Sequence, residues 1–377
     1  LMIALLLATT AFGQHLKIVH GEEVQGADFP EVVAVLGGGT CTGSLIHPEW
    51  VLTAAHCFDG IDLANVPDGN STVFFGNNVT GAGTRIASDA AYVNPEYCSI
   101  GFSPNAIADC SPNGTENDVA LIHLAEPFPG QIMALNEAPI EDAWIGLDIT
   151  HIGFGITTAN GTGSGIKRFT NSFVDSYEDF RIYTWDQQDG RGTCQGDSGG
   201  PSVRYQGAGY IQFAITAFGV ECGTTPGGHM RVDAYLPWIR ETIAPADVLT
   251  VAARPPDFDC SHQLNPGEQS STALGVVPMD LKCEVSSPDP ENITRINWSW
   301  GDGESTEVTE LRANHVYTVQ GVYNLSACIT TDLDGTEFTH CVNKTNHVNA
   351  CDVPEAAFEA TPVEGLGIEL INRTPLR

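Results

Sequence analysis

The sequence Gly196-Asp197-Ser198-Gly199-Gly200-Pro201 combines a nucleophile, a flexible backbone and a carboxylate within a short segment. Ser198 supplies a hydroxyl group, and the glycines around it free the neighbouring backbone amides. Asp197 places a carboxylate next to that serine. Glycine and serine are also common in tight turns, so the motif alone is equally consistent with an ordinary loop. It predicts hydrolysis by an activated serine if a base and an orienting acid occur elsewhere in the chain.

Candidates for both partners lie upstream, each at the border of an apolar run. His56 follows the run 50–52, and the adjacent Cys57 can tie this loop to Cys41. Asp118 opens another apolar run. A serine hydroxyl is a poor nucleophile at neutral pH, so it needs a base to take its proton and a carboxylate to orient that base. A lone histidine or aspartate is more often structural, but the order His, Asp, Ser favours a catalytic triad.

The segments around Cys41, His56, Asp118 and Ser198 resemble the trypsin/chymotrypsin-like serine endopeptidases. The resemblance covers Ile18–Ile243, and the four signatures occur in the family's order at family-like spacing. It implies an all-β, two-barrel chymotrypsin-like protease domain. Protein or peptide substrates are therefore expected.

The resemblance also implies a role for each site residue. His56 would act as general base and then as general acid, Asp118 would hold its tautomer, and Ser198 would attack the scissile carbonyl. The backbone amides of Gly196 and Ser198 would form the oxyanion hole. A catalytically silent, protease-shaped adhesion or binding protein is the alternative class. Silent homologues usually lose at least one triad member, whereas all three are present here.

The segment Lys17-Ile18-Val19-His20-Gly21 resembles the family's activation site. Cleavage after Lys17 by an activating trypsin-like protease would free an ammonium group at Ile18, which would fold inward and pair with Asp197. A buried carboxylate is costly unless it is paired, so this pairing would explain a latent precursor. A surface nick without consequence is the alternative interpretation.

Matching the chain to the family's specificity pocket places Gly192 at the floor, where a trypsin-like enzyme has aspartate. Gly219 and Gly227 would form open walls. An uncharged open slot favours a large apolar or aromatic substrate side chain. The sequence departs from the family at Ala217-Phe218, which replaces the usual Ser-Trp, and at His229, which replaces a usual tyrosine. A histidine there leaves open an acidic substrate preference.

Eleven cysteines in an exported chain are expected to be mostly paired. None lies in a Cys-x-x-Cys motif, which argues against zinc, and no His-Glu-x-x-His pattern occurs. No metal or other cofactor is expected. By the resemblance, two of the pairs are family features, namely Cys41–Cys57 and Cys194–Cys222. Counting outward from the hairpin signal at 334–335 places Cys328 opposite Cys341. The other expected pairs are Cys98–Cys110, within an insertion, and Cys260–Cys283, which leaves Cys351 over.

Short alternating strands follow the protease region and resemble a PKD domain, an immunoglobulin-like β-sandwich. Such a module could bind an extracellular protein or polysaccharide. Trp298 and Trp300 would then be either exposed binding aromatics or core residues. The segments that carry the resemblance are Ile293–Trp300, Gly301-Asp302-Gly303, His315-Val316-Tyr317 and Gly321-Val322-Tyr323.

Composition and chain ends define the setting. The 377 residues, 42% of them hydrophobic, suffice for two or three domains. A net charge of −31 repels phosphates and argues against a nucleic-acid partner. The apolar run Met2–Ala11 is too short to span a membrane and predicts secretion. The expected organisation is signal peptide 1–13, propeptide 14–17, protease domain 18–245, linker 246–257, PKD-like β-sandwich 258–349 and an incomplete second PKD-like module 350–377.

Overall fold

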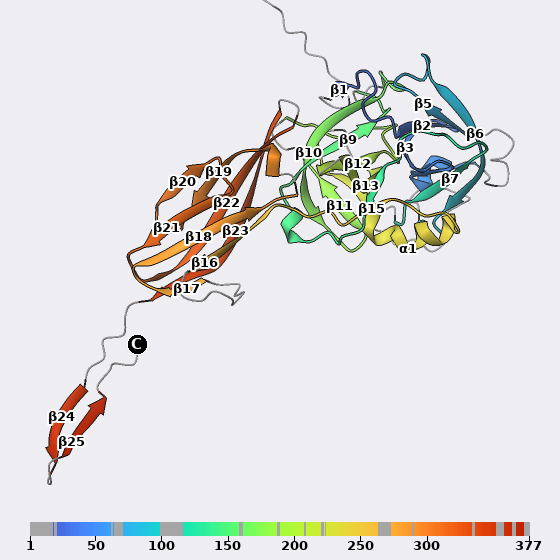
Figure 1. Cartoon of the computed structure of the whole chain (residues 1–377). Helices are drawn as coiled ribbons and strands as arrows, with labels where there is room; N and C mark the ends of the chain where they lie inside the picture. The colour runs from blue at the N-terminus through green and yellow to red at the C-terminus, as the bar shows by residue number, and fades with distance from the viewer. Residues whose placement is uncertain are drawn as a thin grey trace, which may run out of the picture. The chain divides into compact units, whose positions relative to one another are not determined.

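The chain divides into two compact units, residues 1–255 and 256–377, in a computed structural model (Figure 1). The expected signal peptide, propeptide and Lys17 lie outside the residues that the structure describes. None of the helices among the described residues is long and apolar enough to cross a membrane. The described residues are 18, 21–61, 63, 71–98, 116–157, 161–186, 189–206, 209–219, 222, 224–262, 273–288, 290–333, 336–351, 358–363 and 367–372.

The first unit begins with a closed barrel (Figure 1, blue to cyan). Alternate strand residues fill its interior, where Val33, Val51 and Ile122 pack together. Their neighbours face outward and are also buried, against the second half of the unit. Both faces of the strands 32–36 and 50–53 are therefore buried, which explains their hydrophobic runs. The strands, in order around the barrel, are β2 (Val32–Leu36), β3 (Thr40–His47), β4 (Trp50–Thr53), β7 (Ala120–Leu124), β6 (Thr84–Val93) and β5 (Thr72–Phe75).

A nine-stranded sheet forms the second half of the unit, and the pairing of β12 with β13 closes part of it into a second ring. The expected two-barrel, all-β fold is thus confirmed. Residues 250–251 lie in the expected linker, yet they pair with β8 as a strand of this sheet. The strands are β1 (Glu22–Glu23), β8 (Ala134–Asn136), β9 (Asp148–Gly153), β10 (Arg168–Tyr177), β11 (Arg181–Thr184), β12 (Pro201–Gln206), β13 (Gly209–Phe218), β14 (Gly227–Arg231) and β15 (Thr250–Val251).

Helices are few in the first unit. The 3₁₀ helices η1 (Ala55–Phe58) and η3 (Asp142–Trp144) are single turns, and α1 (Val232–Ile243) is the longest helix described. Apolar residues recur along α1 at helical spacing, and they pack on the hydrophobic cluster that the two barrels share. The helix thereby fixes the end of the second barrel.

The second unit contains two sheets that enclose one hydrophobic core. Trp298 and Trp300 are buried in this core and stack on each other, so neither is an exposed binding aromatic. One sheet consists of β16 (Asp257–His262), β18 (Met279–Ser286) and β21 (Arg312–Tyr317). The other consists of β17 (Ala273–Val276), β23 (Thr336–Cys351), β22 (Gly321–Leu333), β19 (Ile293–Ser299) and β20 (Ser305–Val308); η4 (Pro290–Asn292) precedes β19, and β24 (Phe358–Val363) pairs with β25 (Gly367–Asn372).

Four of the expected disulfides are present among the described residues. Cys328 and Cys341 lie directly opposite each other on β22 and β23, as the count from the turn predicts. Cys351 is unpaired and belongs to β23, although the sequence assigned it to the incomplete module. The disulfides are Cys41–Cys57, Cys194–Cys222, Cys260–Cys283 and Cys328–Cys341, while the expected partner of Cys98, Cys110, lies outside the described residues.

Candidate active site

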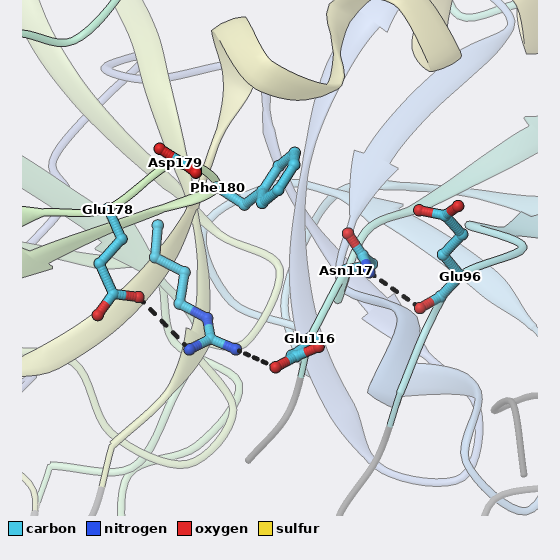
Figure 2. A pocket seen from close by; sticks show the side chains of 7 residues that line it. Glu96, Glu116, Asn117, Glu178, Asp179 and Phe180 are labelled. Carbon is cyan, nitrogen blue, oxygen red and sulfur yellow. Dashed lines mark hydrogen bonds and ion pairs between the residues drawn. The ribbon is translucent and has the colours of Figure 1, made fainter. Parts of the chain in front are cut away.

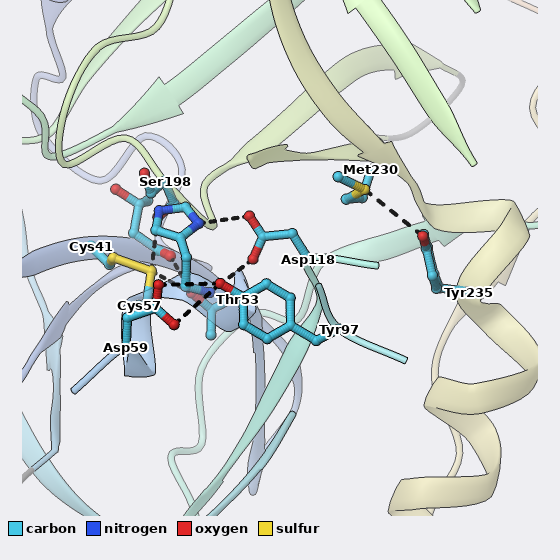
Figure 3. Close-up of polar contacts among 11 residues, drawn as sticks. Cys41, Thr53, Cys57, Asp59, Tyr97, Asp118, Ser198, Met230 and Tyr235 are labelled. Atoms are coloured by element: carbon cyan, nitrogen blue, oxygen red, sulfur yellow. Dashed lines mark hydrogen bonds and ion pairs between the residues drawn. A yellow bond between two sulfur atoms is a disulfide. The ribbon is translucent and has the colours of Figure 1, made fainter. Parts of the chain in front are cut away.

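His56 and Asp118 meet because two paired strands of the first barrel bring them together. His56 lies in η1 just after β4, Asp118 lies just before β7, and Thr53 pairs with Ala120 across these strands. The backbone N–H of His56 donates to Asp118 Oδ1 at 2.8 Å, and His56 Nδ1 lies 2.6 Å from Asp118 Oδ2 (Figure 3). The Asp118 side chain is fully buried, whereas that of His56 is 28% exposed. This geometry leaves His56 Nε2 free to accept a proton.

The electrostatic surroundings of His56 favour its protonated form. Burial alone lowers the pKa of His56, but the Asp118 carboxylate, with a smaller effect from Asp59, outweighs burial and raises the pKa above its usual 6.5. Tyr97 donates its hydroxyl to Asp59 and so holds this second carboxylate in place (Figure 3). The imidazole is therefore a stronger base than an isolated one.

Ser198 lies beside the histidine, in the loop before β12. Its carbonyl oxygen accepts the backbone N–H of Thr42 at 2.8 Å and lies 3.8 Å from Cys57 Sγ. A His56 ring nitrogen lies within 4.8 Å of the sulfur atoms of Cys41 and Cys57 (Figure 3). Both sulfur atoms belong to the Cys41–Cys57 disulfide and are unavailable as metal ligands. The second barrel thus presents Ser198 to the two residues held by the first.

Glycines shape the backbone around Ser198. Gly196 and Gly199 have φ values of +96° and +80°, which other residues rarely adopt. A Cβ atom at Gly199 would overlap the Thr53 hydroxyl and the Thr42 carbonyl oxygen. Within the described part of the chain, the N–H groups of Gly196 and Ser198 donate to no protein acceptor. Two free backbone donors therefore lie beside the serine.

Thr42 connects this loop to both barrels, and the sequence analysis missed it. Its hydroxyl donates to the carbonyl of Gly196 at 2.8 Å and accepts the backbone N–H of Phe154 at 3.0 Å. The Thr42 carbonyl in turn accepts the hydroxyl of Thr53 at 2.7 Å. These partners lie far apart in sequence, so no local pattern could have identified Thr42.

Asp197 turns away from Ser198 into the protein interior. Its two carboxylate oxygens each accept a backbone N–H at 2.8 Å, one from Gly155 and one from Cys194. Side chains at Gly153 or Gly155 would overlap the carboxylate, which explains the two glycines. Burial raises the pKa of Asp197 to about 7, although both hydrogen bonds and Arg168 oppose this shift. Ile18 is also fully buried.

A pocket of about 210 Å³ opens next to Ser198. Of the residues expected to form the specificity pocket, Gly219 lines it directly, and Thr193, the neighbour of Gly192, does so too. A Cβ atom at Gly227 would lie 3.4 Å from the Thr193 hydroxyl, so Gly227 stands just behind this wall. None of the described lining residues is charged; they are Thr193, Cys194, Gln195, Ser198, Thr216, Ala217, Phe218, Gly219 and Cys222.

His229 lies behind Gly227 and is fully buried. Its ring stacks on His151 with centroids 4.8 Å apart, and the Thr184 hydroxyl lies between an Nε2 atom of each ring, 3.1 Å from His151 and 2.8 Å from His229. Burial lowers the pKa of His229 well below 6.5, and the neighbouring His151 adds to this effect. Burial also lowers the pKa of His151 to about 3. Both imidazoles are therefore neutral at physiological pH.

A second pocket, about 620 Å³ in volume, adjoins the segment that carries Asp118 (Figure 2). Asn117 lines it with a φ of 51°, a conformation that asparagine tolerates better than most residues. Tyr235 donates to Asn117 Oδ1 at 2.9 Å, and Asn117 Nδ2 donates to the Glu96 carbonyl at 3.0 Å. These contacts fix the backbone just before Asp118. The other lining residues are Glu116, Glu178, Asp179, Phe180 and Arg181.

Comparisons with known proteins find similarity to serine proteases. The sequence profile of the family described as Trypsin matches residues 18–239. Brachyurin from Leptuca pugilator is 32% identical over 214 residues, which cover 53% of this chain and 86% of that protein. Serine protease SP24D from Anopheles gambiae is 29% identical over 252 residues, which cover 63% of this chain and 84% of that protein. A solved structure described as human heparin binding protein has a TM-score of 0.49 and 22% identity, covering 60% of this chain and 97% of that one.

Proposed function

This chain belongs to the trypsin family of serine proteases, and on that premise we propose that it cleaves peptide bonds with His56, Asp118 and Ser198 as its catalytic triad. The chain is a serine endopeptidase by its family and relatives. One observation carries the triad assignment: His56 Nδ1 lies 2.6 Å from a fully buried carboxylate, and Ser198 lies beside this pair.

The chemistry follows from this arrangement. Ser198 Oγ attacks the scissile carbonyl carbon while its proton passes to His56 Nε2. His56 then protonates the leaving amine, and water attacks the acyl-enzyme by the same route. The free N–H groups of Gly196 and Ser198 would stabilise the oxyanion, and one such donor is typically worth about 3 kcal/mol in the transition state.

Substitution of Ser198 tests the triad against a catalytically silent binding protein. The Ser198→Ala variant should keep the fold and lose peptide hydrolysis, while the processed wild-type protein should react stoichiometrically with an active-site serine label. An unlabelled wild-type protein, or a Ser198→Ala variant that keeps more than a trace of activity, would contradict the assignment.

We infer a preference for large apolar residues on the acyl side of the scissile bond. The described lining of the pocket beside Ser198 is uncharged, and burial of a large apolar side chain is worth about 2 kcal/mol. His229 stays neutral, so it offers no positive charge to an acidic substrate side chain. Cleavage of matched aromatic, arginyl and glutamyl peptides tests this preference. Faster cleavage of the glutamyl peptide would favour the acidic alternative.

Activation is proposed to follow cleavage after Lys17 by a trypsin-like protease. The buried positions of Ile18 and Asp197 support this proposal, since an inserted ammonium group would offset the cost of burying the carboxylate. A Lys17→Gln variant should remain an intact and inactive precursor. Full activity of the intact variant would refute the mechanism.

Secretion and the role of the second unit are further proposals. Four disulfides support an oxidising compartment. The two-sheet core is consistent with a PKD-type sandwich at about residues 258–349, followed by the start of another module. Because Trp298 and Trp300 are buried, binding to an extracellular protein or polysaccharide would use other residues. Binding assays with the full-length Ser198→Ala chain test this, and recovery of wild-type protein from the medium of expressing cells tests secretion.

A further inference from the structure

Arg168 is the central member of a row of charged groups that crosses three strands. In the antiparallel register, Arg168 on β10 lies opposite Glu23 on β1 and opposite Gly153 on β9. Residues that face each other across a sheet project their side chains to the same side. Glu23, Arg168 and any side chain at Gly153 therefore share one face.

Asp197 occupies the side-chain position that Gly153 leaves empty. A Cβ atom at Gly153 would overlap the Asp197 Oδ1 atom. The carboxylate thus lies where a cross-strand neighbour of Arg168 would place its side chain. From β1 through β10 to β9, the row therefore consists of the Glu23 carboxylate, the Arg168 guanidinium and the Asp197 carboxylate.

The Arg168 side chain is only 4% exposed and has an unused donor. Its Nη2 lies 3.5 Å from Glu23 Oε1, and its Nη1 donates to the carbonyl of Gly163 at 2.5 Å. Its Nε has no hydrogen-bond partner among the described residues. Burial lowers the pKa of Arg168, while Glu23 and Asp197 oppose the shift, and Arg168 in turn lowers the pKa of Asp197.

We propose that Arg168 is a positioning residue that serves as a permanent second counter-charge for Asp197 and keeps the Ser198 loop competent at alkaline pH. The proposal rests on the proposed activation, in which the Ile18 ammonium is the first counter-charge. An α-amino group titrates near pH ~8, whereas a guanidinium group stays protonated. When the ammonium loses its proton, Arg168 remains as a positive charge that acts on the buried carboxylate without a direct ion pair.

Other charged groups near this row do not compete for the same role. Lys167 precedes β10 and donates to the carbonyl of Phe29 at 2.8 Å, near Glu31. His151 on β9 stays neutral, because burial lowers its pKa to about 3. The loop 155–166 contains no titratable side chain. Glu23 and Asp197 are the charges that act on the guanidinium.

The test measures the acylation burst of the processed full-length protein from pH 7 to 10. The wild-type burst should stay within about twofold over this range. In Arg168→Gln, the burst should fall with rising pH by up to about tenfold per unit above the pH at which the Ile18 ammonium loses its proton, which is the slope for one linked proton. The melting temperature, measured at each pH, separates this loss from unfolding.

Three further variants complete the design. Glu23→Gln breaks the Arg168–Glu23 ion pair but keeps the guanidinium, so its alkaline profile should match the wild type. Arg240→Gln removes an exposed arginine of α1 and is the matched control. If Arg168→Gln fails to fold, Arg168→Lys takes its place, and its charge should preserve the burst at pH 9.

The outcomes separate this inference from the proposed function. No burst from the wild-type protein at pH 7.5 would refute the triad or its activation. A normal wild-type burst together with a flat alkaline profile in Arg168→Gln would overturn the role of Arg168 alone. If Glu23→Gln lost as much of its alkaline burst as Arg168→Gln, the role of Arg168 would also be overturned, because loss of the Arg168–Glu23 ion pair would then explain the effect. Loss of the burst at pH 9 in Arg168→Lys would overturn the role as well.

Discussion

Replacement of Thr42 by valine removes one oxygen atom from the centre of the site and keeps the shape of the side chain. The Thr42 hydroxyl is buried, donates to the Gly196 carbonyl at 2.8 Å and accepts the Phe154 N–H at 3.0 Å. Valine can do neither. The substitution therefore leaves the Phe154 N–H and the Gly196 carbonyl without this partner.

The expected cost follows from these two hydrogen bonds. A buried donor left unsatisfied costs about 1–3 kcal/mol, and the net value of an ordinary hydrogen bond is about 1 kcal/mol. Thr42→Val should therefore lower the free energy of unfolding of the first unit by about 2–4 kcal/mol. Thr42→Ser keeps the hydroxyl and loses one methyl group, which is worth about 1 kcal/mol. Valine should thus be clearly worse than serine.

Catalysis provides a second measurement on the same variants. The Gly196 carbonyl belongs to the loop whose N–H groups face the proposed oxyanion, so loss of its anchor should lower kcat by at least about tenfold, which is less than the ~10²-fold or greater loss that removal of a whole oxyanion donor causes. Urea unfolding and peptide hydrolysis of both variants would check the two effects. A Thr42→Val protein as stable as Thr42→Ser, with the kcat of the wild type, would refute the reasoning.

Three further predictions concern other parts of the chain. The kcat/KM should fall as pH drops through a His56 pKa above 6.5, since protonated His56 cannot accept the serine proton, and Asp59→Asn should move this limb of the pH profile to lower pH. Gly199→Ala should abolish the acylation burst, because its methyl group would overlap Thr53 and Thr42; a normal burst would contradict the assigned backbone geometry. Replacing Cys328 and Cys341 by serine should cost the second unit about 3 kcal/mol, measured by urea unfolding, and leave peptide hydrolysis unchanged.

Features that depend on local spacing could be read from the sequence. The hairpin signal in the sequence at 334–335 predicts which residues of the two flanking strands face each other, and so the Cys328–Cys341 pair followed by counting. The glycines around Ser198 indicated a backbone conformation that other residues resist, and Gly196 and Gly199 do have positive φ values. In these cases the decisive contacts lie within one hairpin or one loop.

Features that depend on strand order escaped the sequence analysis. Residues 250–251 follow a proline and looked like a linker, yet they form β15 because β8, far upstream, offers a free parallel edge. His229 was noted as unusual, but its partner His151 was not, since β9 and β14 approach only after the second ring closes. Local propensity contains no information about such pairings.

The two barrels contribute unequally to the site, and the division has a physical reason. Asp118 is satisfied by hydrogen bonds from His56, so the base and its carboxylate form within one barrel. The position of Ser198 depends on both barrels. The backbone N–H of Thr42, in the first barrel, donates to the Ser198 carbonyl, and the neighbouring Asp197 accepts a hydrogen bond from Gly155 on the side of the second barrel. Burial destabilises the charge of Asp197, since its pKa is raised to about 7. Control of activity is therefore expected to act on the serine loop, and the His56–Asp118 pair should stay assembled before and after activation.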